Sequence, residues 1–156
     1  MAPTVAPPEN VSAKYYVGVW RNLPNFSTLT PYKTDKIGTI YHTSSSQPFM
    51  TSERGSFVGA VFAADLEFPS SGQWSLYTTS DDGSKLFVDE VEVVDNDGLH
   101  GMVEKSGTIN VSAGDVKHII VTFFERSGGH GLIVSWSGPG VAKAVIPKGA
   151  WKKSSS

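Results

Sequence analysis

Short runs of β-branched and aromatic residues, each followed by turn-forming residues, constrain the fold of this chain most strongly. Runs of strand length that are rich in Val, Ile, Thr, Tyr, Phe and Trp are typical of β-strands. The turns between them account for many of the 16 glycines and 9 prolines. The sequence therefore predicts an all-β fold, with strands near residues 56–68, 73–79, 85–89, 92–94, 107–111, 116–125 and 131–137.

The segments between the predicted strands carry explicit turn chemistry. Residues 69–72, 95–98 and 112–115 combine Pro, Gly, Asn, Asp and Ser, which favour tight reversals of the chain. Consecutive strands joined by such short turns are expected to pair antiparallel. Within 131–137, Leu132 and Trp136 fall on one face by the two-residue period of a strand. An antiparallel β-sandwich or a closed barrel follows.

Composition and charge exclude several classes of function. The 13 basic and 15 acidic residues give a net charge of −2 without a basic stripe, so nucleic acid is not expected as a partner. The absence of cysteine excludes disulfides and zinc-thiolate sites. No apolar run approaches the length of a membrane span. Neither a Gly-x-Ser-x-Gly motif nor a zinc-type His spacing is present, so we expect a binding protein with no catalytic residues rather than an enzyme.

The length of 156 residues suits one domain. Residues 1–13 are rich in proline and lack a periodic pattern, so they are predicted to form a flexible N-terminal segment. Residues 148–156, which end in a Lys-Ser tail, are predicted to form a second extension. The folded domain is expected over residues 14–147.

Four segments, in order, resemble the PA14 family, which is named for a domain of anthrax protective antigen and also occurs in fungal and bacterial adhesins and in some glycosidases. They span residues 57–74, 79–89, 106–114 and 123–140. The second is the most specific, because the family pattern runs Ser-Asp-Asp-Gly, then an apolar strand that ends in Asp, as residues 80–89 do here. The resemblance implies a PA14-like antiparallel β-sandwich.

In sugar-binding members of that family, the paired aspartates hold Ca²⁺, and the resemblance assigns this role to Asp81 and Asp82. Adjacent side chains on a regular strand point to opposite faces, so two neighbouring carboxylates reach one ion only where the backbone departs from a strand. The family solution is a cis peptide bond between the two aspartates. Calcium accepts about six to eight oxygen ligands, so sugar hydroxyls can complete its coordination shell.

The rest of such a site is expected from two loops. Ser127, Gly128, Gly129 and His130 are the predicted additional metal ligands, chiefly through main-chain oxygens that the glycines leave accessible. Sugar-binding relatives commonly place an Asn, Asp or Gln side chain in this loop, and this chain does not. Asn96, His100 and His130, together with the two aspartates, are the predicted ligand contacts. As alternatives, Asp81-Asp82-Gly83 and residues 95–98 are also ordinary turn sequences.

The leading functional hypothesis is a calcium-dependent carbohydrate-binding module of a lectin or adhesin. Its expected cofactor is Ca²⁺, and its expected partner is a mono- or oligosaccharide or a cell-surface glycan. The alternatives are a structural or protein-interaction PA14 domain that binds no sugar, and an accessory domain of a glycosidase. A monomeric module of a larger extracellular or cell-surface protein is expected, because weak calcium sites need a compartment that is rich in calcium.

Overall fold

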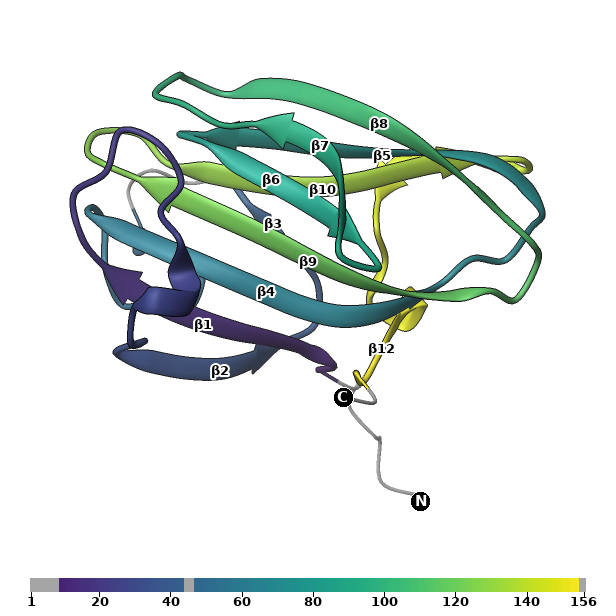
Figure 1. Cartoon of the computed structure of the whole chain (residues 1–156), viewed down its shortest axis with the longest axis horizontal. Helices are drawn as coiled ribbons and strands as arrows, with labels where there is room; N and C mark the ends of the chain where they lie inside the picture. Colours follow the sequence, from purple (N-terminus) through teal and green to yellow (C-terminus); the bar gives the residue numbers. More distant parts are fainter. Residues whose placement is uncertain (1–8, 44–46, 155–156) are drawn as a thin grey trace, which may run out of the picture.

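The computed structural model describes residues 9–43 and 47–154 and folds into two antiparallel sheets that pack face to face (Figure 1). Alternation of buried and exposed residues along the strands explains this arrangement. In β5 (Gly72–Asp81), for example, Trp74, Leu76 and Thr78 are buried and the residues between them are partly exposed. The predicted all-β antiparallel β-sandwich is confirmed.

The first sheet has seven strands, and β4 and β9 lie at its centre. Its order is β2 (Lys33–Ile37), β1 (Val11–Val17), β4 (Val58–Glu67), β9 (Val116–Glu125), β6 (Ser84–Val88) and β7 (Val91–Asn96), and β12 (Trp151–Lys152) pairs with one end of β4.

The second sheet has five strands and is built around β5. Its order is β11 (Val141–Val145), β10 (Gly131–Gly138), β5 and β8 (Val103–Val111), and β3 (Tyr41–His42) pairs with β10. Two short 3-10 helices, η1 (Phe26–Thr28) and η2 (Lys148–Ala150), lie outside the sheets. Among the described residues, neither helix has the length or the apolar character to cross a bilayer.

The three predicted turns reverse the chain, but the expected pairing across them is wrong. Residues 69–72 lead from β4 into β5, residues 95–98 from β7 into β8, and residues 112–115 from β8 into β9. Each turn therefore joins strands of opposite sheets. Because the chain crosses from one sheet to the other at each turn, consecutive strands pack against each other through the core. Each strand then forms its hydrogen bonds with strands from more distant parts of the chain. The tight hairpins are instead β6–β7 and β10–β11.

The core lies between the two sheets and is rich in aromatic side chains. Trp74 of β5 and Trp136 of β10 have ring centroids 4.8 Å apart, and Phe68 packs against both. At the other end of the core, Phe49 stacks on Phe123 with centroids 4.3 Å apart. Fully burying aromatic side chains of this size stabilises a fold by about 1.5–3 kcal/mol each. This core fixes the ends of the strands, where the loops begin.

The two ends of β4 mark the two ends of the sandwich. Val58 pairs with Glu125 at one end, and Leu66 pairs with Trp151 at the other. At the Trp151 end, Asn10 Nδ2 donates to the main-chain oxygen of Trp151 at 3.0 Å. The folded region is wider than residues 14–147, because β1 begins at Val11 and β12 follows residue 147. Residues 1–8 and 155–156 of the predicted extensions lie outside the described residues.

Candidate metal and ligand site

The paired aspartates lie where β5 ends and β6 begins. Asp81 is the last residue of β5, and a cis peptide bond joins it to Asp82, as the family resemblance implies. Gly83 then leads into β6. A Cβ atom at Gly83 would lie 2.6 Å from a ring carbon of Phe124 and 2.8 Å from the main-chain nitrogen of Gly98. The Asp-Asp-Gly sequence therefore passes so close to β9 and to the loop after β7 that only glycine fits its third position.

The Asp82 carboxylate connects two loops. It is 7% exposed, and its Oδ2 accepts a hydrogen bond from the main-chain N–H of Arg126 at 2.9 Å. Its Oδ1 accepts one from the main-chain N–H of His100 at 3.3 Å. The start of the loop after β9 and the middle of the loop after β7 consequently lie beside Asp82. The sequence-based expectation that these two loops border the aspartates agrees with these contacts.

The loop after β9 is small and polar and is exposed beyond Arg126. Ser127, Gly128 and Gly129 are exposed, and Gly128 has φ +85°, a conformation that favours glycine. His130 differs, because its ring is buried and stacks on His42 with centroids 4.9 Å apart. Its Nδ1 lies 3.0 Å from His42 Nε2. The imidazole of His130 therefore belongs to the core and does not face the aspartate pair as a side-chain ligand.

The loop after β7 carries the other two predicted ligand contacts. Both ring nitrogens of His100 face carbonyl oxygens, Nε2 that of Asn96 and Nδ1 that of Gly101, each at 2.8 Å. These two contacts hold the imidazole of His100 against its own loop. The Asn96 side chain is buried, and its Nδ2 donates to the main-chain oxygens of Thr78 and Val103 at 3.2 and 2.8 Å. Asn96 thus fixes the start of the loop after β7 to β5 and β8.

A buried polar network lies beneath the aspartate pair and joins the two sheets. Ser80 Oγ of β5 is 2.7 Å from Ser84 Oγ of β6, and Ser84 Oγ is 3.0 Å from Thr78 Oγ1. Asn96 Nδ2 completes the network, whereas Asn96 Oδ1 is buried without a hydrogen-bond partner among the described residues. The hydrogen bonds of this network fix the relative position of β5, β6 and the end of β7.

Glu125, the last residue of β9, is a site residue that the sequence reasoning missed. Its carboxyl is fully buried, and neither oxygen has a hydrogen-bond partner among the described residues. Burial, and then the negative charges of Asp82 and Asp81, raise its pKa to about 8. The signal was present in the sequence, because the two-residue period of β9 puts Glu125 on the same face as the core residues Val121 and Phe123.

The carboxyl of Asp81 is also perturbed. Partial burial, and then the adjacent charge of Asp82, raise its pKa to about 6. None of the ion pairs among the described residues includes Asp81, Asp82 or Glu125. Three carboxyl groups therefore gather at one end of the sandwich without a Lys or Arg partner, and a cation would relieve the repulsion among them.

The residues present fit a hard cation such as Ca²⁺, which takes oxygen ligands in irregular geometry. Within the part of the chain that the structure describes, no three His, Cys, Asp or Glu side chains converge into a ready-made metal-binding group. The two aspartates would therefore need further oxygen ligands, such as main-chain oxygens, to hold an ion.

The order and spacing of these features agree with one known domain. A family model for the PA14 domain matches residues 13–150. The chain belongs to the PA14 domain family. A search of curated proteins finds no significant match.

Solved structures share the fold of this PA14 domain at low sequence identity. An anti-sigma factor domain-containing protein aligns with a TM-score of 0.80 and 21% identity, over 95% of this chain and 48% of that one. This chain thus spans about half the length of that relative. A PA14 sugar-binding domain from an RTX adhesin aligns with a TM-score of 0.76 and 15% identity, over 94% and 99% of the two chains.

A third similar structure comes from a fungal adhesin. The Epithelial Adhesin 6 A domain of Candida glabrata, in complex with Galβ1-3GlcNAc, aligns with a TM-score of 0.69 and 10% identity, over 96% of this chain and 89% of that one. At these identities the likeness shows the fold alone.

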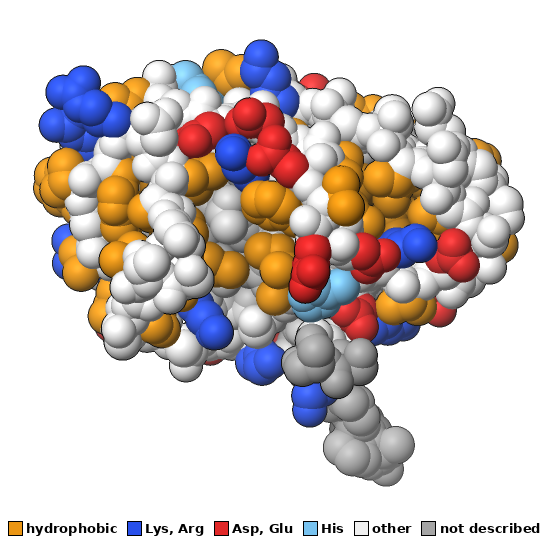
Figure 2. Space-filling model, in the orientation of Figure 1, with side chains coloured by type: hydrophobic (Ala, Val, Ile, Leu, Met, Phe, Trp, Pro, Cys, Tyr) orange, Lys and Arg blue, Asp and Glu red, His pale blue; other side chains and the backbone are white. Residues whose placement is uncertain are grey.

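Exposed apolar side chains surround the acidic end of this PA14 domain. Val19, Leu99 and Met102 are 62%, 44% and 46% exposed, and they belong to the loops after β1 and β7. Figure 2 shows hydrophobic side chains beside Lys and Arg side chains at the left end of the molecule, the end to which these loops run in Figure 1. The site therefore combines a negatively charged centre with an apolar border.

Proposed function

We propose that this PA14 domain is a calcium-dependent carbohydrate-binding module. The observation that carries the proposal is the cluster formed by Asp81, Asp82 and the buried, unpaired Glu125. A buried carboxylate without a partner is costly unless a cation compensates for its charge. The sugar-binding domains of two adhesins share this fold, which supports carbohydrate as the ligand class.

In this proposal Asp81 and Asp82 hold the ion, and main-chain oxygens of Ser127, Gly128 and Gly129 approach it from the other side. Bound calcium supplies open coordination positions that neighbouring sugar hydroxyls can fill. A bound cation would favour the ionised form of Glu125 behind the aspartates. The apolar border would contact the CH face of a sugar ring. The same argument favours an extracellular or cell-surface location, where calcium is abundant enough to occupy a weak site.

The first experiment measures calcium binding alone. Isothermal titration calorimetry with CaCl₂ should detect one site in the whole chain, and Asp82→Asn should abolish the heat. Glu67→Gln is the matched control, because Glu67 is an exposed carboxylate at the far end of β4. A chain that binds no calcium would rule out the proposed mechanism.

The second experiment tests the ligand. Binding to a panel of immobilised glycans should appear with calcium, disappear with chelator and return when calcium is restored. Glycan binding that the chelator leaves unchanged would contradict the role of the ion.

One observation favours a structural or protein-interaction domain as the second candidate. The exposed loop 127–129 has no carboxylate or carboxamide side chain to complete a calcium shell. In this alternative the buried carboxyls remain protonated and only stabilise the loops. Absence of calcium binding, together with absence of binding to any glycan of the panel, would favour this candidate.

A further inference from the structure

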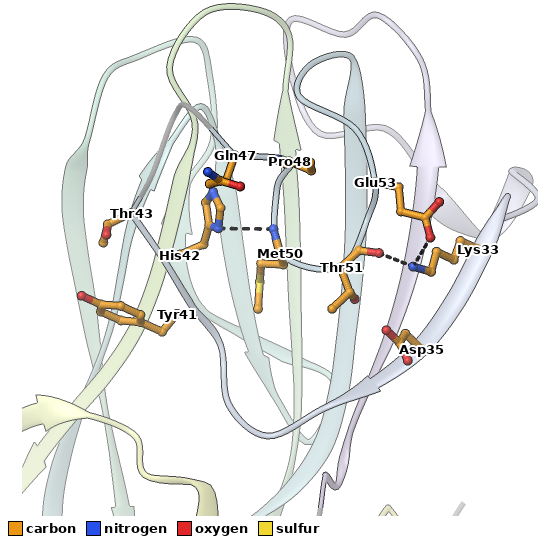
Figure 3. Close-up of a pocket in the computed structure, with 10 residues that line it drawn as sticks. All are labelled: Lys33, Asp35, Tyr41, His42, Thr43, Gln47, Pro48, Met50, Thr51 and Glu53. Atoms are coloured by element: carbon orange, nitrogen blue, oxygen red, sulfur yellow. Dashed lines mark hydrogen bonds and ion pairs between the residues drawn. The ribbon is translucent and has the colours of Figure 1, made fainter.

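A pocket lies at the open edge of the sandwich, between β2 of the first sheet and β3 of the second. It has a volume of about 600 Å³, and its lining includes Lys33, Asp35, Tyr41, Thr43, Thr51 and Glu53. Figure 3 shows the Tyr41 ring on one side of the pocket and Lys33, Asp35 and Glu53 on the other. None of these residues belongs to the acidic site described above.

Tyr41 gives the pocket an apolar wall. Its side chain is 52% exposed, although it stands on a strand that pairs with Ile133 of β10. A large aromatic side chain that is fixed on a strand and left in water can bind a ligand with a flat apolar face. The CH face of a pyranose ring has that character, whereas its edge carries hydroxyl groups.

The opposite wall supplies polar groups for that edge. Lys33 Nζ is 2.9 Å from Glu53 Oε1, and Asp35 Oδ1 accepts a hydrogen bond from the main-chain N–H of Lys36 at 2.8 Å. Carboxylate oxygens form strong hydrogen bonds with hydroxyl donors. The lining carries one Lys against one Asp and one Glu, a formal charge of −1. This balance disfavours anionic ligands such as sulfated or uronic sugars and favours neutral ones.

The walls are already fixed without a ligand. Thr51 Oγ1 is 2.7 Å from the hydroxyl of Tyr15, whose side chain is fully buried. The main-chain N–H of Met50 donates to His42 Nδ1 at 3.3 Å, so the proton of a neutral His42 ring is on Nε2. A pocket held from the core in this way loses little conformational entropy on binding.

We propose that this pocket is a second carbohydrate-binding site, which takes a neutral saccharide without calcium. The sugar ring would stack on Tyr41, and its hydroxyls would donate to Asp35 and Glu53. The pocket contains no group that needs a metal ion. This proposal goes beyond the calcium-dependent site, because it uses different residues at a different edge of the sandwich.

The test is an NMR titration of the whole ¹⁵N-labelled chain with galactose, glucose, mannose, N-acetylglucosamine and Galβ1-3GlcNAc, with chelator present throughout. We expect at least one sugar to shift the amide signals of Tyr41, Thr43 and Thr51. Tyr41→Ala should weaken that binding about tenfold, the size of one lost aromatic contact. Asp35→Asn, which leaves the Tyr41 wall intact, should weaken it as well.

Two variants serve as controls. Tyr77→Ala removes a tyrosine of the same sheet that does not line the pocket, and it should leave the binding unchanged. Asp82→Asn should also leave it unchanged, while it abolishes calcium binding. If no sugar shifts the pocket amides in chelator, or if Tyr41→Ala binds as the parent does, the second site is refuted and the calcium-dependent function is unaffected. If only the calcium-dependent glycan binding is absent, the calcium-dependent function is refuted and the second site is not.

Discussion

The main-chain N–H of Arg126 donates a hydrogen bond to Asp82 Oδ2 at 2.9 Å, across 44 positions of the sequence. This contact holds the loop after β9 against the aspartate pair. A carboxylate that accepts main-chain hydrogen bonds positions a loop as well as carrying charge. Asp82 therefore has a structural role that is separate from any role as a metal ligand.

Asp82→Ala should loosen both loops that the carboxylate holds. The main-chain N–H groups of Arg126 and His100 lose their acceptor. A lost hydrogen bond to a charged group destabilises a protein by about 1.5–3 kcal/mol, and relief of repulsion with Glu125 offsets part of it. Hydrogen exchange should be faster at these two amides in the variant, and Glu67→Gln should leave it unchanged. Equal protection in variant and parent would contradict the role.

Glu125→Gln should have opposite effects on stability and on calcium. In chelator at about pH 9, above the pKa of Glu125, the variant should melt at a higher temperature, because it no longer buries an unpaired charge. Its calcium affinity should fall about tenfold or more, since one negative charge of the cluster is lost. Thermal melts and calorimetry measure the two effects. Unchanged calcium affinity would remove Glu125 from the site.

The calcium-free domain should become less stable as the pH rises from about 4 to about 8. Burial raises the pKa of Asp81 from 3.8 to about 6 and that of Glu125 from 4.5 to about 8. Between the unfolded and folded pKa values the folded state binds more protons, so the free energy of unfolding falls as the pH rises. Thermal melts in chelator across this range measure the decline.

Two further measurements separate the contribution of Glu125 to this pH dependence from that of Asp81. Glu125→Gln should remove most of the decline between about pH 6 and pH 8, because Glu125 has the higher pKa of the two carboxyls. Calcium should bind more weakly at about pH 6 than at about pH 8, because it must displace protons. Stability that rises with pH in chelator would show that these carboxyls are not buried together.

Gly83→Ala should destabilise the domain by about 1–3 kcal/mol, the usual cost of overpacking. The new Cβ would lie 2.6 Å from a ring carbon of Phe124 and 2.8 Å from the main-chain nitrogen of Gly98. Urea denaturation gives the difference in stability. Gly101→Ala is the control, because nothing lies within 4 Å of a Cβ at that position. Equal stability of the two variants would mean that the segment between β5 and β6 can move away from β9.

Local patterns predicted much of this structure. The strands later observed as β4 to β10 follow from their composition, and the family pattern around Asp81 and Asp82 indicated the sandwich and the cis peptide bond. The assignment of strands to sheets did not follow, because a turn such as 69–72 has the same composition whether it closes a hairpin or crosses between sheets. Short strands such as β3, with two residues, leave too little pattern to find.

The candidate site was predictable only where a motif marks it. The position of His130 depends on its contact with His42, 88 residues away in the sequence, which no local pattern encodes. That contact turns the imidazole of His130 into the core. Glu125 was predictable in principle from the period of β9, because an acidic residue there shares the core-facing side with Phe123.

The pairing of β4 has a mechanical consequence for a longer protein. Asn10 and Trp151 meet at one end of the sandwich, whereas Glu125 pairs with Val58 at the other. Eight residues separate Val58 from Leu66, the partner of Trp151, which is about 27 Å of extended strand. Asn10 and Trp151 therefore lie on the side of the domain opposite the acidic loops. A pulling force applied at these two residues would pass into β4 through the neighbouring strands β1 and β12, and it would leave the acidic loops at the far end of the sandwich.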